Sequence, residues 1–357
     1  MCLIGHPDLG KRRLRHRHPT GSGIGHNGRM RAVTLTGLGR LEVVEASVPR
    51  SRPGWSVVQV LACGICGTDR HILHGDYPAR PPLILGHEFG GLLHEPGPDC
   101  PLPAGSMVSV DPNICCGDCW QCRDGSPALC AERIALGVDI DGGLAQYVLV
   151  PDTQLYTVPQ HVDPLQLAFV EPLACCLRAI DLAGEMSGAR VAVVGGGVIG
   201  QLVVQLARNA GASTITLVTR QPLRQELGRS MGAAWSGDMA DRPSRDHDLV
   251  FECAGVPGTM TDSLDLARPG GSVILLGITG RDHLQSVSPF DLVVRELRLQ
   301  GSFLNPRTQF RAVQLIADGT LNLDPLATRI VGWDEVVDGI RATPGPTDIK
   351  VILQPSA

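Results

Sequence analysis

Hydrophobic and polar residues follow a regular order over the second half of the chain. Short apolar runs rich in valine, isoleucine and leucine are separated by stretches in which apolar residues recur every three or four positions. The longer stretches predict helices, most clearly at 198–209 and 222–231. The short runs predict strands at 191–194, 215–218, 233–235, 249–253, 272–277 and 297–303. Strands alternating with helices indicate an α/β fold with a doubly wound parallel sheet.

The first half of the chain has a different pattern. From Met30 to about residue 179, short strands such as 56–63 and 143–150 are separated by frequent glycine and proline, which predicts an irregular β domain with long loops. A helix expected at 333–341 and a strand at 349–353 do not continue the later alternation. We therefore expect domains at 30–179 and 180–313, with 314–357 returning to the first. Residues 1–29 lack periodicity and predict a disordered tail.

Composition excludes two classes of partner. The 357 residues carry a net charge of −5 with a pI near 6.1, which gives no electrostatic reason to expect a nucleic acid. The longest apolar stretch, 191–207, is interrupted by four glycines and two glutamines, so no membrane span is predicted. No apolar segment follows the basic N-terminal patch, so no secretory leader is predicted. We expect a cytoplasmic protein that acts on a small molecule.

A glycine-rich turn follows the first predicted strand of the second domain. Gly195, Gly197 and Gly200 form a G-x-G-x-x-G motif between that strand and a helix that begins at Val198 and Ile199. The three glycines permit a tight turn, a close approach of the backbone to a pyrophosphate, and close packing of helix on strand. The helix N-terminus offers free N–H groups to the phosphates. The motif predicts a dinucleotide site; the alternative is a glycine-rich turn of an unrelated α/β protein.

The end of the next predicted strand bears on the choice of dinucleotide. An NAD site usually has Asp or Glu about 20 residues after the glycine motif, where this chain has Thr219. Arg220 follows, and Arg224 lies one helical turn further on. A hydroxyl and a guanidinium suit a 2′-phosphate, so we predict NADP in preference to NAD. The alternative is that Arg220 is solvated and stacks on adenine while NAD is used.

Five of the twelve cysteines lie between residues 115 and 130. Cys116, Cys119, Cys122 and Cys130 have the spacing C-x2-C-x2-C-x7-C, and four thiolates can close a tetrahedral Zn²⁺ site with no position left for a substrate. The spacing predicts a structural zinc lobe that folds around its metal. An iron–sulfur cluster is the alternative, although the run lacks the Cys-Pro ending of bacterial ferredoxins. Cys115 leaves the register of the site open.

A second set of ligand types is dispersed along the chain. Cys66, His87, Glu88 and Glu171 supply a thiolate, an imidazole and two carboxylates. Together they suit one Zn²⁺ with a position open to substrate or water. Cys63 and Cys66 form a C-x2-C pair, for which a redox role is the alternative.

These motifs occur in an order that resembles the zinc-dependent medium-chain alcohol dehydrogenases. Their sequences are Cys66-Gly-Thr-Asp-Arg-His71, Gly86-His-Glu88, the cysteine lobe, Glu171-Pro-Leu-Ala and the glycine turn. The resemblance extends from about Met30 to Pro355 and is closest to the polyol branch, which includes sorbitol, threonine and butanediol dehydrogenases. It implies a GroES-like catalytic domain, a Rossmann domain inserted before the last segment, two Zn²⁺ per chain, a nicotinamide cofactor, and a homodimer or homotetramer.

The resemblance also implies roles for single residues. Cys66 and His87 match the ligands of the catalytic zinc. Glu88 matches a further ligand that can exchange with water, and Glu171 a third ligand or its indirect substitute. Asp69 would orient His87.

Two more residues match a proton relay in that family. Thr68 would take the proton of the alcohol and pass it through a ribose hydroxyl of the cofactor to His71. Zinc would lower the pKa of the alcohol, and hydride would pass to the nicotinamide. We therefore expect a dehydrogenase of a polyol, cyclitol or other secondary alcohol. The alternatives are a biosynthetic ketone reductase and a non-catalytic, zinc-stabilised nucleotide-binding sensor.

Overall fold

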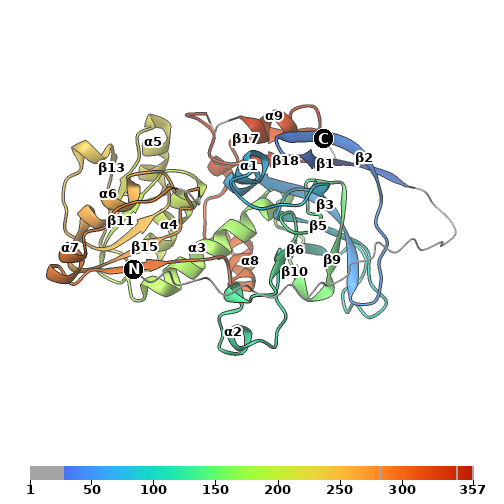
Figure 1. Cartoon of the computed structure of the whole chain (residues 1–357), viewed down its shortest axis with the longest axis horizontal. Coiled ribbons are helices and arrows are strands. Elements are labelled where there is room, and N and C mark those ends of the chain that lie inside the picture. The colour runs from blue at the N-terminus through green and yellow to red at the C-terminus, as the bar shows by residue number, and fades with distance from the viewer. Residues whose placement is uncertain (1–27, 281–282, 343–344, 356–357) are drawn as a thin grey trace, which may run out of the picture.

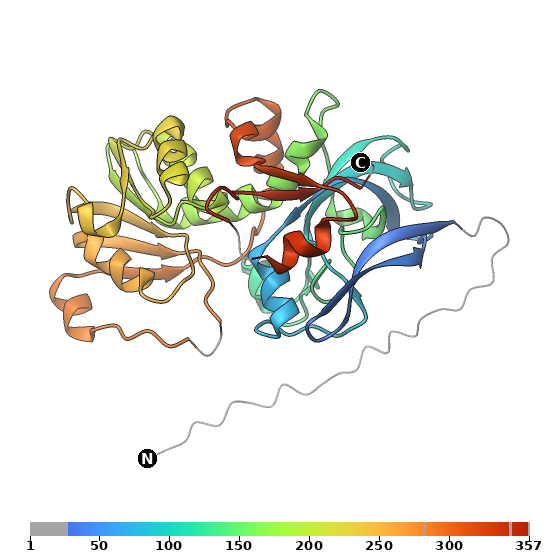
Figure 2. The ribbon, with the colours of Figure 1, turned by 90° about the horizontal axis from the view of Figure 1, so that it is seen from above.

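The computed structural model describes residues 28–280, 283–342 and 345–355. Two domains lie side by side, one rich in strands and built from both ends of the chain, the other built from its middle (Figures 1 and 2). The predicted tail falls almost wholly outside the described residues. The first strand begins at Arg29, at the end of that segment.

The strand-rich domain contains a seven-stranded and a three-stranded sheet. The larger sheet has the order β10(Leu155–Thr157), β6(Met107–Val110), β5(Glu88–Glu95), β3(Trp55–Ile65), β18(Val351–Leu353) and β17(Arg329–Val331), with β9(Tyr147–Pro151) also paired to β3. The smaller sheet has the order β2(Arg40–Ser47), β1(Arg29–Gly37) and β4(Leu83–Ile84). The end of the chain joins this domain because β18 pairs antiparallel with β3, with Val351 opposite Ile65.

Short helices and a small lobe complete this domain. Its elements outside the two sheets are α1(Gly67–His74), α9(Val336–Arg341), η2(Asp152–Gln154), η3(Pro164–Phe169) and η5(Asp324–Leu326). The lobe consists of β7(Asn113–Ile114), α2(Trp120–Arg123), η1(Pro127–Leu129) and β8(Ile134–Ala135), and it projects from the body of the molecule (Figure 1). The predicted helix at 333–341 is shorter in the structure, because the 3 residues before Val336 form a turn.

The middle domain has the predicted doubly wound parallel sheet. Its strand order is β13(Trp235–Gly237), β12(Thr214–Val218), β11(Arg190–Val194), β14(His247–Glu252), β15(Ala267–Leu275) and β16(Arg298–Gly301), all parallel. Its helices are α4(Val198–Asn209), α5(Pro222–Met231), η4(Met239–Asp241), α6(Thr259–Leu266) and α7(Pro289–Val294). The order of strands reverses at β11, so the crevice that binds ligands in such sheets opens at the carboxyl ends of β11 and β14.

Two helices pass between the domains. The predicted boundaries at 179/180 and 313/314 fall inside α3(Val170–Ala183) and α8(Gln309–Ala317). Leu177 of α3 and Ile316 of α8 belong to one buried cluster with Val203 of α4. Helical periodicity predicts which face of such a helix is buried, but not which domain buries it.

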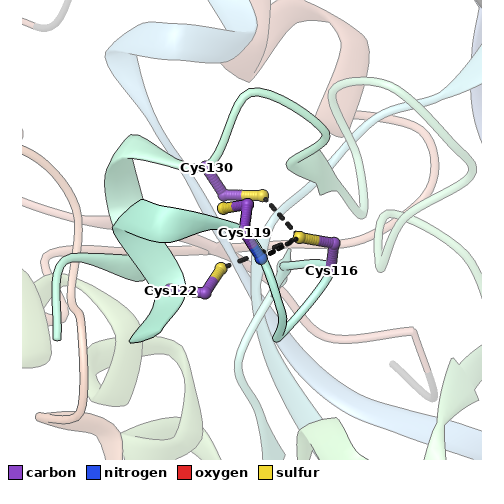
Figure 3. A group of neighbouring side chains, drawn as sticks. All are labelled: Cys116, Cys119, Cys122 and Cys130. Atoms are coloured by element: carbon purple, nitrogen blue, oxygen red, sulfur yellow. Dashed lines mark hydrogen bonds between the residues drawn. The ribbon is translucent and has the colours of Figure 1, made fainter. Parts of the chain in front are cut away.

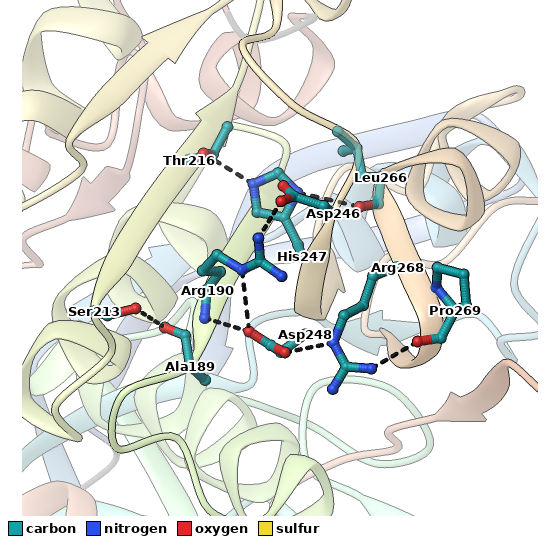
Figure 4. Close-up of polar contacts among 10 residues, drawn as sticks. All are labelled: Ala189, Arg190, Ser213, Thr216, Asp246, His247, Asp248, Leu266, Arg268 and Pro269. Atoms are coloured by element: carbon teal, nitrogen blue, oxygen red, sulfur yellow. Dashed lines mark hydrogen bonds and ion pairs between the residues drawn. The ribbon is translucent and has the colours of Figure 1, made fainter.

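One histidine is buried in the middle domain (Figure 4). Nδ1 of His247 lies 3.1 Å from the carbonyl oxygen of Leu266, and Nε2 lies 3.0 Å from Oγ1 of Thr216. Next to it, the Asp248 carboxylate accepts a hydrogen bond of 2.7 Å from the backbone N–H of Arg190. Burial lowers the pKa of His247, because the charged imidazolium would lose solvation there.

In the described part of the chain, no helix has the length and apolar character needed to cross a bilayer.

Candidate metal and dinucleotide sites

The four cysteines of the lobe converge on one point (Figure 3). The sulfur atoms of Cys116, Cys119, Cys122 and Cys130 all lie within 4.8 Å of one another. The backbone N–H of Cys119 also donates to Sγ of Cys116 at 3.4 Å, a contact that favours a thiolate. Sγ of Cys115 instead donates to the carbonyl of Pro127 at 3.2 Å, so Cys115 lies outside the set. Four convergent sulfurs fit a closed tetrahedral Zn²⁺ site.

A second cluster lies at the ends of two paired strands. Ligand atoms of Cys66, His87 and Glu88 lie within 4.8 Å of one another. Cys66 follows β3 and caps α1, whereas Glu88 is the first residue of β5 and His87 directly precedes it. Gly86 directs the chain into this turn with φ 94°, where a Cβ atom would lie 2.6 Å from the backbone nitrogen of Leu144. A side chain at that position is therefore excluded.

Two orphaned polar atoms test whether this cluster fits a metal. Oδ1 of Asp69 and Nδ1 of His87 are buried without a hydrogen-bond partner and lie 3.8 Å apart. Oδ2 of Asp69 accepts the backbone N–H of Cys66 at 2.8 Å, which holds the carboxylate in place. A carboxylate that faces one ring nitrogen is the usual support for a histidine that binds metal through the other. These residues therefore fit Zn²⁺.

The charge of the site also favours a cation. Burial by itself lowers the pKa of His87, but the neighbouring Cys66 and Asp69 outweigh it and raise that pKa well above the ordinary value. Asp69 is fully buried, and burial raises the pKa of its carboxyl group. Buried carboxylates beside a half-buried thiol are stabilised by a cation that they can coordinate.

Lys350 is a member of this site that the sequence analysis did not identify. Its Nζ forms an ion pair with Oε2 of Glu88 and lies 3.4 Å from the carbonyl oxygen of Ile65. Lys350 is 2% exposed and Glu88 3% exposed, so neither charge reaches solvent. In the sequence, Lys350 is marked only as a single charged residue directly before the apolar run that forms β18. The ion pair gives Glu88 a second partner besides a metal.

Glu171 lies outside the three-residue cluster. It is buried in the first turn of α3 and accepts a hydrogen bond of 3.3 Å from the thiol of Cys175, one turn later. Burial raises its pKa to about 7; nearby His87 opposes this rise, and Glu88 adds to it. The structure thus brings Glu171 into electrostatic contact with the site but not into the predicted ligand set. Cys175 was also missed, because the adjacent pair of Cys175 and Cys176 in this helix has no metal-ligand spacing.

The two residues of the predicted proton relay share a cavity between the domains. The cavity has a volume of about 330 Å³. It is lined by Thr68, His71, Asp76, Tyr77 and Pro78 from the strand-rich domain and by Ile278, Thr279 and Gly280 from the middle domain. Thr68 also lies beside the metal cluster, because its Oγ1 is 3.7 Å from Sγ of Cys66.

The glycine turn has the close contacts that its sequence predicts. Gly195 has φ 107°, and a Cβ atom there would lie 2.8 Å from the backbone nitrogen of Ala254. A Cβ atom on Gly200 would collide with the carbonyl oxygen of Gly195. Gly197 caps α4, whose first residues are Val198 and Ile199, so their N–H groups face the crevice end of the helix.

Thr219 and Arg220 lie at this turn, at the end of β12. A Cβ atom on Gly196 would lie 2.7 Å from Oγ1 of Thr219, so the buried hydroxyl adjoins the glycine backbone. Arg220 is exposed and has no hydrogen bond or ion pair with any described residue.

Arg224 lies one helical turn after Arg220 and contacts the C-terminal segment. Its Nη2 donates to the carbonyl oxygens of Asp348 at 2.9 Å and Gly345 at 3.4 Å. Burial also lowers the pKa of this guanidinium. The helical turn after Arg220 carries Arg224 towards the returning C-terminal segment, and a role of Arg224 at the cofactor stays a prediction.

Comparisons with known proteins agree with this geometry. Residues 52–160 match the alcohol dehydrogenase GroES-like domain and residues 198–318 the zinc-binding dehydrogenase model. L-threonine 3-dehydrogenase of Pyrococcus horikoshii is 31% identical over 82% of this chain and 89% of its own length. The chain belongs to the zinc-dependent alcohol dehydrogenase family. It is therefore a dehydrogenase, with the GroES-like and Rossmann-type domains of that family.

Other relatives of this dehydrogenase act on sugar-derived alcohols or acids by name. D-altritol 5-dehydrogenase of Agrobacterium fabrum is 33% identical over 76% of this chain and 84% of its own length. A solved structure described as a zinc-binding dehydrogenase of Sinorhizobium meliloti bound to NADP is 42% identical, with a TM-score of 0.89 over 92% of this chain and 100% of that chain. L-idonate 5-dehydrogenase of Escherichia coli is 27% identical, with a TM-score of 0.85 over 92% of this chain and 99% of that chain.

Proposed function

We propose that this dehydrogenase oxidises a secondary alcohol of the polyol, cyclitol or sugar-like class and uses NADP as its hydride acceptor. In the balanced reaction the carbinol carbon loses a hydride, the hydroxyl loses a proton, and a ketone forms. The observation that carries the proposal is the Cys66, His87 and Glu88 cluster beside the cavity between the two domains. The named activities of the relatives support the class of substrate.

The residues of this chain have separable tasks in the reaction. Cys66 and His87, with Glu88 or Glu171, would hold a catalytic Zn²⁺, which when bound supplies a Lewis acid for the alcohol oxygen while NADP supplies the hydride acceptor. Thr68, 3.7 Å from Cys66 Sγ, accepts the proton of the alcohol.

Further along the cavity, His71 receives the proton that leaves Thr68 and releases it to water. Asp69 keeps His87 oriented from behind. Run in reverse, the same groups reduce a ketone, so the physiological direction is a question of substrate concentrations.

Two zinc ions per chain are part of the proposal. The lobe of Cys116, Cys119, Cys122 and Cys130 would hold the second, structural ion. A nucleotide-binding sensor without catalysis would need only this ion. Elemental analysis of the purified protein distinguishes them, with about two Zn per chain expected for the enzyme and one for the sensor.

The preference for NADP rests on Thr219 and Arg220. The exposed guanidinium of Arg220 has no partner among the described residues and is available to a phosphate, and no carboxylate stands at position 219 to repel one. The Sinorhizobium relative, which carries NADP, supports the same choice. Arg220→Ala should weaken NADP binding by about 1.5–3 kcal/mol and leave NAD binding nearly unchanged. Arg208→Ala, at the far end of α4, is the matched control, and a higher kcat/KM with NAD than with NADP in the wild type contradicts the preference.

An apolar face on the middle domain supports a homodimer or homotetramer. Leu284, Phe290, Val293 and Val294 are each more than 60% exposed around α7. In the described chain, β16 pairs with β15 on one side only, so its other edge is open for a second copy. Val293→Asp should reduce the mass measured by light scattering to that of a smaller assembly, and an unchanged mass contradicts this interface.

The substrate and the metal site are tested together. Wild-type protein is assayed with polyols, inositols and sugar alcohols in the presence of each dinucleotide. His87→Ala should nearly abolish turnover while NADP still binds, because the glycine turn lies on the other domain. Retention of the wild-type kcat by both His87→Ala and Cys66→Ser contradicts the proposed site.

A further inference from the structure

The turn after α1 folds an aspartate back onto the histidine of the proton relay. Gly75 adopts φ 87° and ends the helix. The backbone N–H groups of Asp76 and Tyr77 then donate to the carbonyl oxygen of His71 at 2.8 Å and 3.2 Å. The backbone therefore fixes where Asp76 stands, and Oδ2 of its carboxylate lies 3.3 Å from Nδ1 of His71.

This contact determines which nitrogen of His71 is free to accept a proton. A neutral imidazole carries hydrogen on one nitrogen only, and a carboxylate accepts but does not donate. Asp76 therefore selects the form in which Nδ1 carries the hydrogen. The lone pair is then on Nε2. When Nε2 gains a proton, the carboxylate also stabilises the positive charge of the ring, as an aspartate does in a Ser-His-Asp triad.

The position of the pair indicates a role in proton transfer rather than in folding. Both residues line the cavity that contains Thr68 and that the middle domain closes with Thr279. The His71 side chain is 35% exposed and that of Asp76 51% exposed. An ion pair with that much solvent contributes little to stability, so removing it should leave the fold intact.

We propose that Asp76 is a positioning residue for proton release: it holds His71 with hydrogen on Nδ1, so that Nε2 accepts the proton leaving Thr68. The proton then passes from Nε2 to water, and the neutral ring returns to its starting form. No electrons are transferred in these steps. The proposal rests on the proposed function, because it assigns a partner to the relay of that reaction.

The test compares three variants of the zinc-loaded enzyme with saturating NADP. Asp76→Ala removes the carboxylate, Asp76→Glu keeps one, and Asp99→Ala removes an exposed aspartate elsewhere in the same domain. Asp76→Ala should lower kcat about 10-fold, by analogy with the lower end of the range for carboxylates that orient a metal-bound histidine, with the Kd of NADP unchanged within about 2-fold. Asp76→Glu should recover much of the rate, and Asp99→Ala should match the wild type.

A spectroscopic measurement reports the role without turnover. Long-range proton–nitrogen NMR of ¹⁵N-histidine protein distinguishes which ring nitrogen carries hydrogen, and His71→Gln assigns the signal. The wild type should show hydrogen on Nδ1, and Asp76→Ala should show a mixture of both forms. An unchanged form in Asp76→Ala overturns the proposal, as does a wild-type kcat. A loss of NADP affinity alone also overturns it, since Asp76 would then be a cofactor contact.

Failure of the proposed function and failure of the proposal for Asp76 give different results. If the wild type oxidises no alcohol in the panel, the proposed function is contradicted. The NMR comparison still decides whether Asp76 sets the form of His71, because it requires no substrate.

Discussion

Lys350→Met tests the buried ion pair beneath the proposed catalytic metal. Lys350 and Glu88 are 2% and 3% exposed, and Nζ of Lys350 also lies 3.4 Å from the carbonyl oxygen of Ile65. Methionine is close to lysine in length and fills the same space without the charge. With Cys66, His87 and Glu171 as the ligands of the metal, the variant leaves the Glu88 carboxylate without a partner in a site that water does not reach, which costs about 3–5 kcal/mol.

The loss in free energy of unfolding has an upper limit, because a carboxylate without a partner can take up a proton. For an acid with an ordinary pKa near 4.3, protonation costs about 3.7 kcal/mol at pH 7 and about 1 kcal/mol at pH 5. A chain of 357 residues has an unfolding entropy of about 0.75 kcal/mol/K, so the limit corresponds to a fall in Tm of about 5 °C at pH 7. The deficit should shrink to about 1–2 °C at pH 5.

Calorimetry of the zinc-loaded protein at both pH values is the assay. Adding Glu88→Gln to Lys350→Met should recover most of the lost Tm, because the double variant has no buried charge without a partner. Arg311→Met is the matched control: it breaks an ion pair with Asp181 whose side chains are 46% and 38% exposed, and it should cost less than about 1 kcal/mol. A Lys350→Met protein that melts within about 1 °C of the wild type at pH 7 refutes the reasoning, as does a deficit that persists at pH 5.

Three other perturbations have defined outcomes. Cys119→Ser should lower zinc content by about one ion per chain and lower Tm more than kcat; unchanged zinc content would count against a structural site. Gly200→Ala should abolish dinucleotide binding in titration calorimetry, because its Cβ would collide with the carbonyl of Gly195. Since burial lowers the pKa of His247 (Figure 4), the unfolded chain binds more protons below pH 6.5, and stability falls as pH falls from 6.5 towards the folded pKa. His247→Gln should reduce this slope of Tm between pH 7.5 and 5.5, and an unaltered slope contradicts the assignment.

Local pattern was sufficient for most of the fold. The six-stranded parallel sheet is confirmed, and α4 has the predicted limits at both ends, because a buried parallel strand reads as an apolar run and a helix start can be read from its glycine cap. Some strand limits differ from the prediction, including those of β14 and β15 inside the sheet. β15 begins at Ala267, five residues early, because pairing with its neighbour outweighs the Arg-Pro-Gly-Gly sequence that reads as a turn.

The site was less predictable where its residues carry no motif. The four cysteines of the lobe follow a spacing set by metal geometry, so sequence alone locates them. Cys66 and His87 are dispersed, and the resemblance of their motifs to the family assigned them as ligands. Lys350 reaches Glu88 from a strand 262 residues later, and Asp76 contacts His71 through the backbone turn after α1, so neither contact is marked by a motif. The sequence also contains no sign that Arg224 donates to the carbonyl oxygen of Asp348, because helical spacing does not show which part of the chain a side chain faces.

Lys350 also differs in residue type from the other long basic side chains of the described residues. Within the described residues it is the sole lysine, and every other long basic side chain there is an arginine. The space around it explains why this position differs: a Cβ atom on Gly64 would lie 2.6 Å from Cε of Lys350, so the backbone of β3 passes directly over the side chain. A slender ammonium group fits such a gap and approaches a carboxylate as a point charge, whereas a planar guanidinium needs room for its fork of donors. The last strand of the chain therefore does more than complete the first sheet. It places a charge beneath the proposed metal site that balances one of its carboxylates, which is a physical reason for the chain to return to the domain where it began.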